Sequence, residues 1–437
     1  MTQIRELQAP TLPRSLWAAT AVAPKRFDAL EDDIATEVAV VGGGFTGLST
    51  ALHLSERGID VAVIEAAEPG WGASGRNGGQ VIPGLKYDPD ELEAMFGADL
   101  GGRMAKAAGE APDVVFDIVA RYGLDCEADR RGWIQAAFGR KSLETLTRRA
   151  RQWQARGVAA RALDGAEATR LIGGKGYVGG WADPRGGGLQ PLSYARELAR
   201  VAAGNGARIF AATPATKLSR SAKGWRVETP GGSVTAATVI LATNGYTDAL
   251  WPGLERSVIP VYSFQIATVP LSENLRRTVL PEGHVVSDSR RLLRYFRLDS
   301  HGRLLMGGRS PFTDRPTFED GRTLKGWIEE MFPQLGDVEM EYVWSGRVAV
   351  TADHLPHLNA LAPGVYAALG FNGRGVAMTT QMGRILADLA SGTPAEELPF
   401  PVTSVQPIRF HGFYRPVLEG LVRYYRLRDR WEAAKTA

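Results

Sequence analysis

Apolar runs and helix-like segments alternate in the first part of the chain. Residues 38–41 form a short apolar run, apolar positions between residues 48 and 54 recur at helical spacing, and residues 60–65 form a second apolar run. Short apolar runs indicate buried strands, and the helical spacing indicates a helix with one face in the core. The pattern therefore predicts a strand, a helix and a strand in succession, which is the βαβ unit of an α/β fold.

A glycine-rich turn lies between the first predicted strand and the helix. It comprises residues 42–47, and Glu65 closes the second apolar run. Glycines allow a tight turn and the close approach of a pyrophosphate, which would lie at the helix N-terminus. The carboxylate of Glu65 can accept hydrogen bonds from both ribose hydroxyls of an adenosine, and it disfavours a 2′-phosphate. The unit predicts a binding site for an adenine dinucleotide.

Elements of the same kind return twice later in the chain. The predicted elements are a helix over 192–203, strands over 207–211, 225–229, 233–237, 238–243 and 364–369, and a helix over 376–389. Residues 258–345 are mostly β in pattern, with strands expected over 263–269, 292–298 and 303–307. We therefore predict a Rossmann-like domain assembled from discontinuous segments and interleaved with an α+β substrate domain whose sheet is mostly antiparallel. The expected segments are an N-terminal extension (1–35), the nucleotide-binding domain (36–85, 186–255 and 346–395), the substrate domain (86–185 and 256–345) and a C-terminal tail with a helix (396–437).

Composition narrows the function classes. The 437 residues are 44% hydrophobic and 23% charged, which is ordinary for a globular protein and, at this length, favours two domains. The net charge of +3 gives no reason to expect a nucleic acid partner. Cys126 is the only cysteine, which excludes a CxxC dithiol centre and the disulfide reductases. Because we find no apolar leader or membrane-length run, we expect a soluble cytoplasmic protein without membrane contact.

A second glycine-rich stretch, residues 70–80, follows the first unit and offers another stretch of backbone to a flat or phosphorylated ligand. Nicotinamide dehydrogenases usually complete the nucleotide domain in one block, whereas flavin enzymes often return to it late in the chain. The late returns and the second cradle therefore favour FAD. The candidate cofactor-binding residues are Gly42, Gly44, Phe45, Thr46, Gly47, Glu65, Ala66, Ser74, Gly75, Arg76, Asn77, Gly78, Gly79, Gln80, Ala215, Ala242, Thr243, Asn244, Gly370, Asn372, Gly373, Gly375 and Val376.

At these residues the sequence resembles the FAD-dependent amine and amino acid oxidoreductases of the D-amino acid oxidase type. More narrowly, it resembles the bacterial γ-glutamylputrescine oxidoreductase branch, with L-pipecolate oxidase a near relative. The segments that carry the resemblance are residues 41–48, 72–80, 241–246, 344–346 and 370–376. The resemblance implies FAD, oxidation of a C–N bond, and an FAD domain beside a substrate domain. Some relatives attach the flavin through cysteine or histidine, but no cysteine lies near these loops, so we expect noncovalent FAD.

Amine oxidation by a flavin requires a neutral amine, its α-carbon held against the ring, and stabilisation of negative charge at flavin N1 and C2=O. The loop 372–375 is the best candidate for this stabilisation, because the following helix N-terminus supplies partial positive charge and Arg374 adds a full charge. The alternative is a glycine turn that only joins strand to helix. In the resembling families a His often occupies the position of Arg374, and some amine oxidases have Lys where this chain has Ala377. A dehydrogenase therefore stays open beside an oxidase.

Alternation with period two predicts a strand over 291–298, with Tyr295 and Arg297 on one face. This face is expected to cover the flavin, so Tyr295 and Arg297 are candidates to bind a substrate carboxylate. The alternative is a row of solvent-facing arginines. Tyr262 and Trp344 are candidate pocket walls, or ordinary core aromatics, and Arg347 is a further carboxylate candidate.

Two other patterns lie outside these segments. His354 and His357 lie near Asp353, but Pro356 breaks any helix that would align the imidazoles, so no metal site is predicted. Residues 416–431 form a basic amphipathic helix, for which docking on the same chain is favoured over a membrane surface.

The sequence thus predicts FAD-dependent oxidation of a C–N bond in a carboxylate-bearing amine such as γ-glutamylputrescine. Hydride passes to flavin N5, water hydrolyses the imine, and electrons leave to oxygen or an electron carrier. Three alternatives stay open: an oxidase or dehydrogenase of L-pipecolate, sarcosine, glycine or D-amino acids, an FAD hydroxylase that uses NAD(P)H, and a nonenzymatic flavoprotein.

Overall fold

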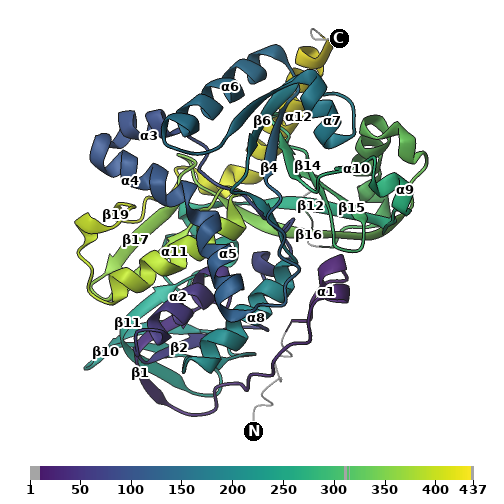
Figure 1. The fold of residues 1–437 in the computed structure, drawn as a ribbon. Coiled ribbons are helices and arrows are strands. Elements are labelled where there is room, and N and C mark those ends of the chain that lie inside the picture. Colours follow the sequence, from purple (N-terminus) through teal and green to yellow (C-terminus); the bar gives the residue numbers. More distant parts are fainter. Residues whose placement is uncertain (1–9, 310–312, 314, 435–437) are drawn as a thin grey trace.

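Two β-sheets form the framework of the computed structural model, which describes residues 10–309, 313 and 315–434 (Figure 1). One sheet has nine strands and the other has eight, and each collects strands from distant parts of the sequence. The nine-stranded sheet is parallel at its centre, and the eight-stranded sheet is mostly antiparallel. The predicted α/β fold, with a Rossmann-like domain built from discontinuous segments, is confirmed.

Parallel strands occupy the centre of the first sheet in the order β18, β11, β1, β2, β8. Because they run in the same direction, the turns after β1, β2, β11 and β18 meet at one edge of the sheet. The antiparallel strand β17 and its neighbour β19 extend the sheet beyond β18, and the hairpin β9–β10 branches from β11. The strands are β1 (Ile34–Val41), β2 (Val61–Ile64), β8 (Arg208–Phe210), β9 (Lys217–Ser221), β10 (Gly224–Glu228), β11 (Ser233–Leu241), β17 (His357–Ala362), β18 (Val365–Leu369) and β19 (Val402–Thr403).

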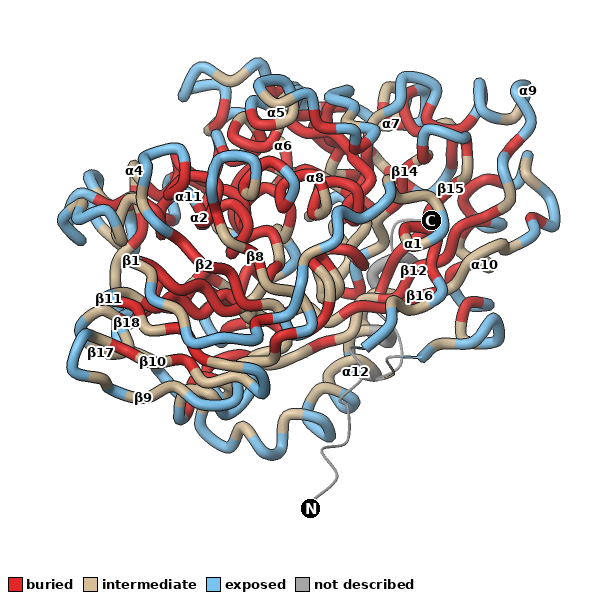
Figure 2. Tube along the Cα trace, turned by 90° about the horizontal axis from the view of Figure 1, so that it is seen from below, coloured by how far each residue is buried: buried red, intermediate tan, exposed pale blue. Residues whose placement is uncertain are grey.

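The two faces of strand β1 belong to different hydrophobic clusters. Val38 and Val40 pack with helices α2 (Phe45–Ser55), α8 (Pro191–Gly204) and α11 (Gly375–Ala390). Ala39 and Val41 pack with the β10–β11 hairpin on the other face. This burial on both faces explains why the strand is continuously apolar rather than alternating. Figure 2 shows the buried strands and helices as a red interior enclosed by exposed turns.

Helices from residues 86–122 join the core of the first sheet. Helices α4 and α5 share a hydrophobic cluster with α2 and α11, and α5 packs directly on α11. Strands β4, β5 and β6 belong to the other sheet. The segment 86–185, expected as part of the substrate domain, is thus divided between both sheets. The helices of this region are α3 (Pro89–Phe96), α4 (Ala98–Gly109) and α5 (Ala111–Tyr122).

The second sheet has the strand order β16, β12, β15, β14, β13, β4, β6, β5, and only the β13–β4 pair is parallel. A two-stranded ribbon, β3 with β7, lies apart from both large sheets. The strands are β3 (Gln80–Val81), β4 (Trp133–Ala137), β5 (Arg161–Asp164), β6 (Gly179–Asp183), β7 (Gly187–Gly188), β12 (Ile259–Pro270), β13 (Val285–Asp288), β14 (Tyr295–Leu298), β15 (Arg303–Arg309) and β16 (Met340–Val350). The helices are α6 (Arg140–Ala155), α7 (Gly165–Ile172), α9 (Glu273–Arg276) and α10 (Phe318–Met331).

Three predicted elements differ from the structure. The strand expected over 291–298 begins only at Tyr295, because the Asp288 carboxylate accepts the backbone N–H groups of Arg290 and Arg294 at 3.1 and 3.0 Å and closes a turn. The strands expected over 233–237 and 238–243 form one strand, β11, which pairs with β10 and with β1. Helix α10 interrupts the region expected to be mostly β.

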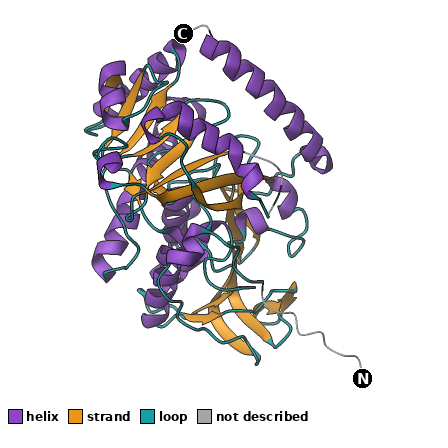
Figure 3. Cartoon of the chain, turned by 90° about the vertical axis from the view of Figure 1, so that its right-hand side faces the viewer, coloured by secondary structure: helices purple, strands orange, loops and turns teal. Residues whose placement is uncertain are grey.

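Two terminal segments pack on the rest of the chain. Helix α12 (Tyr414–Ala434) runs along the outside (Figure 3), where the Asp429 carboxylate accepts hydrogen bonds from Arg291 Nη1 at 3.1 Å and from Leu292 N at 3.2 Å. Near the other end, helix α1 (Leu16–Thr20) buries Trp17. The C-terminal helix therefore docks on its own protein, and no helix in the described part of the chain is long and apolar enough to cross a membrane.

Candidate active site

The glycine turn after β1 has no room for a side chain at Gly42 or Gly47. Gly42 has φ +109, and a Cβ on it would lie 2.9 Å from the carbonyl oxygen of Ala242. A Cβ on Gly47 would lie 2.0 Å from the oxygen of Gly42. Ser74, from the second glycine-rich stretch, accepts a hydrogen bond from Phe45 N at 2.9 Å. The turn is therefore held in a single shape, with the first N–H groups of α2 beside it.

Glu65 follows β2 directly and faces the glycine turn. Its carboxylate accepts hydrogen bonds from Gly43 N at 2.6 Å and from Ala67 N at 2.8 Å. Burial raises the pKa of Glu65, and the N–H groups of Ala67, Gly43 and Ala66 oppose this effect. A carboxylate has about four acceptor positions, so lone pairs are left for a ribose. The loop that contains Ala215 lies alongside, because Thr213 N donates to the Glu65 carbonyl at 2.8 Å.

The stretch 70–80 is braced from several directions. The carbonyl of Arg76 accepts hydrogen bonds from Gln265 Nε2 at 2.9 Å and from Trp344 Nε1 at 3.0 Å. The carbonyl of Asn77 accepts one from Trp17 Nε1 at 2.7 Å, and the Asn77 side chain accepts one from Gly79 N at 2.8 Å. These contacts fix the backbone of the stretch against the second sheet, as a rigid surface for a flat ligand requires.

Arg297 lies beneath this stretch rather than facing an open pocket. Its guanidinium donates to the carbonyl oxygens of Gly78 at 2.8 Å and Leu189 at 2.6 Å, and also to that of Leu298 at 3.1 Å. Burial lowers the pKa of Arg297 to about 10, so it stays charged at neutral pH. Gln80 Nε2 similarly donates to two carbonyls of the second sheet. The geometry favours a bracing role for Arg297 over a role in binding substrate.

Tyr295 packs between the stretch 70–80 and strand β15. A Cβ on Gly78 would lie 2.8 Å from its ring, and one on Gly307 would lie 2.0 Å from it. Its hydroxyl shares a 2.7 Å hydrogen bond with Ser263. Burial raises the pKa of Tyr295, so the phenol keeps its proton at neutral pH.

Three loops are joined at the carboxyl edge of the first sheet. Ala242 N donates to the Val41 carbonyl at 2.8 Å, and the Asn244 side chain accepts from Gly370 N at 3.0 Å. The Asn372 side chain accepts from Thr351 N at 3.0 Å. Asn244 and Asn372 have φ values of 43 and 53, and their side-chain contacts hold them in this left-handed conformation. The remaining candidates Thr243, Gly373, Gly375 and Val376 lie in the same loops or at the start of α11.

Arg374 immediately precedes helix α11, and its guanidinium lies 5.0 Å from the centre of the Trp133 ring. A small cavity beside it is lined by Trp181, Asp88 and Arg149, whose Nε pairs with Asp88. Burial, followed by repulsion from Arg149, lowers the pKa of Arg374 to about 9, which leaves it charged at neutral pH. Within the described residues this guanidinium makes no ion pair, so a nearby anion would be strongly favoured.

A separate aromatic and cationic cluster forms where the second sheet meets the stretch 70–80. The Arg347 guanidinium lies 5.1 Å from the ring of Tyr246 and 5.8 Å from the ring of Tyr262. Arg76 stacks on Trp71 at 4.3 Å, and the Trp71 and Tyr246 rings are 5.5 Å apart. Tyr262 is therefore brought together with Arg347, whereas Arg374 belongs to the Trp133 group.

Sequence reasoning overlooked some of the residues that build these groups. Tyr246 lies inside a segment that carries the family resemblance and Trp71 directly precedes another, so these positions were the signal that could have identified them. Trp17 gave no local signal, because its contacts are with distant segments. Trp344, expected as a pocket wall, is 1% exposed and packs edge-on against Trp17 at 5.8 Å, which is a core position.

The similarity of this chain to known proteins agrees with the geometry of the site. The family model described as DAO, FAD dependent oxidoreductase, matches residues 37–389. The chain belongs to this family. It is an FAD-dependent oxidoreductase that acts on CH–NH or CH–NH2 donors, oxidising amine or amino acid substrates and passing electrons to an acceptor.

Individual relatives extend over nearly the whole chain. Gamma-glutamylputrescine oxidoreductase of Escherichia coli strain K12 is 34% identical over 424 residues, which cover 95% of this chain and 98% of that protein. The probable oxidoreductase OrdL of Haemophilus influenzae is 33% identical over 370 residues, which cover 82% of this chain and 83% of that protein. Glycine oxidase from Geobacillus kaustophilus has the same fold, with a TM-score of 0.71, 23% identity, and coverage of 86% of this chain and 99% of that one.

The residues present fit FAD. The glycine turn and the N-terminus of α2 provide space and N–H groups for a pyrophosphate, and Glu65 ends β2 beside them. Open space also lies at Gly373 and Gly375, where a Cβ would meet no atom within 4 Å, whereas a Cβ on Gly370 would lie 2.2 Å from Cγ2 of Thr351. Residues 42–47, Glu65 and the stretch 70–80 would hold the dinucleotide, and the loop 370–375 would border the flavin.

Proposed function

We propose that the enzyme oxidises a C–N bond in a carboxylate-bearing amine of the γ-glutamylputrescine type. The observation that carries this proposal is the position of Arg347, whose guanidinium lies over Tyr246 and Tyr262 at the junction of the two sheets. The relative named gamma-glutamylputrescine oxidoreductase, 34% identical over 95% of this chain, supports the same substrate class.

The cluster around Arg347 has the groups that such a substrate needs. A guanidinium binds a carboxylate through paired, charge-assisted hydrogen bonds. The rings of Tyr246 and Tyr262, which flank the guanidinium, offer faces for the methylene groups of an alkyl amine. The carboxylate end of the substrate is therefore held at Arg347, and the length of the substrate's alkyl chain determines where its amine α-carbon lies.

The chain contributes positioning and positive charge to the reaction. FAD, when bound, supplies the acceptor for the hydride equivalent. The N-terminus of α11 and the Arg374 guanidinium place positive charge at the loop that borders the flavin. Tyr295, a half-buried phenol that shares a hydrogen bond with Ser263, keeps its proton and orients neighbours rather than acting as a base. The imine product is hydrolysed by water.

The Arg347→Gln variant tests how the carboxylate is bound. We expect kcat/KM for γ-glutamylputrescine to fall by about tenfold to a hundredfold, because one charge-assisted hydrogen-bonded pair is lost. Activity with putrescine, which has no carboxylate, should change little. Arg322→Gln, at an exposed position on α10, is the matched control. Equal losses with both amines would contradict carboxylate binding by Arg347.

A panel of amines tests the substrate class itself. Under anaerobic conditions, γ-glutamylputrescine should bleach the flavin absorbance faster than L-pipecolate, sarcosine, glycine or D-alanine. Adding oxygen and measuring peroxide then separates an oxidase from a dehydrogenase. Failure of every amine to bleach the flavin would contradict the proposal.

We also propose that FAD is bound noncovalently. The only cysteine, Cys126, is fully buried in the hydrophobic cluster of α2 and α11, and burial raises its pKa to about 12, so it lacks a reactive thiolate. Acid precipitation should release all of the yellow colour into the supernatant. Colour that stays with the precipitated protein would contradict this proposal.

A further inference from the structure

A cavity of about 300 Å³ lies beside the loop that joins β16 to β17. We call it the β16–β17 groove. Its apolar walls include Phe96 and Met104 from α3 and α4, together with Leu355. Its polar lining includes Asp353, His357 and Thr403. The groove lies beyond β18 at the far end of the first sheet, so it is separate from the glycine turn after β1 and from the Arg347 cluster.

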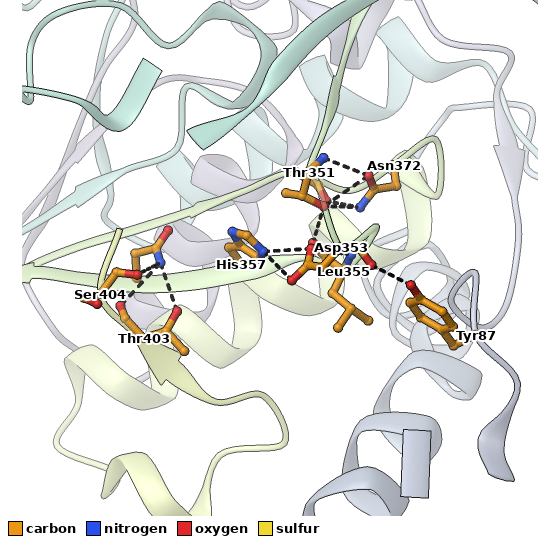
Figure 4. A network of polar contacts seen from close by, with 10 residues as sticks. Tyr87, Thr351, Asp353, Leu355, His357, Asn372, Thr403 and Ser404 are labelled. Atoms are coloured by element: carbon orange, nitrogen blue, oxygen red, sulfur yellow. Dashed lines mark hydrogen bonds and ion pairs between the residues drawn. The ribbon is translucent and has the colours of Figure 1, made fainter. Parts of the chain in front are cut away.

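One carboxylate dominates the charge of this groove. Both carboxylate oxygens of Asp353 lie 3.0 Å from Nε2 of His357, and Oδ1 also accepts a hydrogen bond from Leu355 N at 3.1 Å (Figure 4). Partial burial raises the pKa of Asp353, but the hydrogen bonds from His357 and Leu355 outweigh it and hold the pKa at about 2. Its side chain is still 49% exposed, against 18% for His357. The described lining contains no lysine or arginine.

From this arrangement we propose that the β16–β17 groove binds a small alkylammonium ion. The ammonium group lies on the exposed side of the Asp353 carboxylate, and the methylene groups pack against Phe96, Met104 and Leu355. The combination of an apolar wall with one exposed anion complements an alkyl chain that ends in a cation. The site is independent of the catalytic proposal, because none of its lining residues belongs to the candidate active site.

The groove is connected to the loop that borders the flavin. Leu355, whose N–H donates to Asp353 at 3.1 Å, accepts at its carbonyl a hydrogen bond from the Thr351 hydroxyl at 2.8 Å, and the Thr351 N–H donates to the Asn372 side chain at 3.0 Å. Figure 4 shows this chain of contacts from His357 to Asn372. An ion bound at Asp353 therefore adds a contact to the turn that holds Asn372, and the flavin absorbance should shift on binding.

Calorimetric titration of the FAD-loaded protein tests the site. The probes are 1-aminobutane, 1-butanol and butanoate. We expect 1-aminobutane to show saturable binding and the alcohol and the acid to bind at least about tenfold more weakly. Equal binding of 1-butanol would reduce the groove to an apolar pocket, and tighter binding of butanoate would reverse its charge preference. Either result, or no saturable binding of 1-aminobutane, overturns the proposal.

Variants locate the binding to the groove. Asp353→Asn should weaken 1-aminobutane binding about tenfold, and Asp337→Asn, at an exposed position elsewhere, should leave it unchanged. Ala352→Trp fills the groove without altering Asp353, so it gives a second measurement if Asp353→Asn folds poorly. The flavin content of each variant reports whether it is folded. Unchanged amine affinity in Ala352→Trp would place the ion elsewhere and overturn the proposal.

Discussion

At Gly47 a side chain of any size is excluded by the turn that precedes it. The nearest atom to a built Cβ is the Gly42 oxygen at 2.0 Å, and both atoms belong to the backbone path of the glycine turn. A methyl group there displaces either the turn or the start of α2, and both border the expected pyrophosphate site. The constraint therefore concerns FAD binding before it concerns catalysis.

We predict that Gly47→Ala loses most of its FAD, because the clash cannot be relieved by moving a flexible side chain. The ratio of flavin absorbance to protein absorbance in purified material measures this. Gly204→Ala is the matched control, since a Cβ on Gly204, at the end of α8, would meet no atom within 4 Å. A variant with full flavin content would contradict the steric argument.

Ionisation of Asp353 makes the stability of the folded protein depend on pH, and the direction of this dependence follows from the pKa shift. Its pKa in the folded protein is about 2, below the usual 3.8, so the ionised carboxylate stabilises the folded state above pH 3.8. This contribution is lost as the pH falls from 3.8 towards 2. Wild-type protein should therefore have a higher Tm than Asp353→Asn at neutral pH, and the difference should shrink through this acidic range. A Tm difference that grows on acidification would contradict the assignment.

Among the elements, the junction of α1, the stretch 70–80 and strand β14 depends on one buried cation. Arg297 donates to the carbonyls of Gly78 and Leu189 and lies 5.1 Å from the Trp17 ring. Each buried carbonyl that loses its donor costs about 1–3 kcal/mol. The side chain therefore connects three segments that are remote in sequence.

We predict that Arg297→Met lowers the free energy of unfolding by about 3 kcal/mol, because buried carbonyls are left without donors. Its flavin content should also fall, since the stretch 70–80 loses its support. Urea denaturation and flavin absorbance measure the two effects. Arg322→Met on the surface of α10 is the control. Normal stability combined with a raised KM would instead indicate that Arg297 binds substrate.

The accuracy of the sequence predictions differs between elements for a physical reason. Helix α2 and strand β2 were predictable, because apolar spacing and glycine position are local signals. Strand β14 was only half predicted, because the Asp288 side chain takes the Arg294 N–H that a longer strand would use. The roles of Arg297 and Tyr262 depend on contacts between remote segments, about which periodicity carries no information.

At the scale of the whole molecule, helix α1, which lies within the segment expected as an N-terminal extension, packs into the structural core. Trp17 is 1% exposed, donates to the Asn77 carbonyl and packs on Trp344. Its own carbonyl accepts from Gln190 Nε2 at 3.0 Å. The segment thus joins the two sheets at the stretch 70–80.

We predict that Trp17→Ala lowers the free energy of unfolding by about 3 kcal/mol or more, as expected for a large buried aromatic. Trp17→Phe keeps an aromatic ring but loses the N–H and part of the buried indole, so its loss should lie between about 1 kcal/mol and that of Trp17→Ala. Chemical denaturation measures both. Phe413→Ala, at a position 66% exposed, is the control. A Trp17→Ala protein as stable as wild type would show that helix α1 contributes little to the stability of the fold.

Interleaving of the two sheets has a consequence for biosynthesis. Strand β1 emerges from the ribosome long before β11, its neighbour on one side, and β18 follows β11 only after β12–β17 have been synthesised. Until then the nascent chain carries unpaired, strongly apolar strand edges, the kind of surface that aggregates or recruits chaperones. The nine-stranded sheet therefore cannot be completed before β17, β18 and β19 are synthesised, by which point every strand of the eight-stranded sheet has already been made.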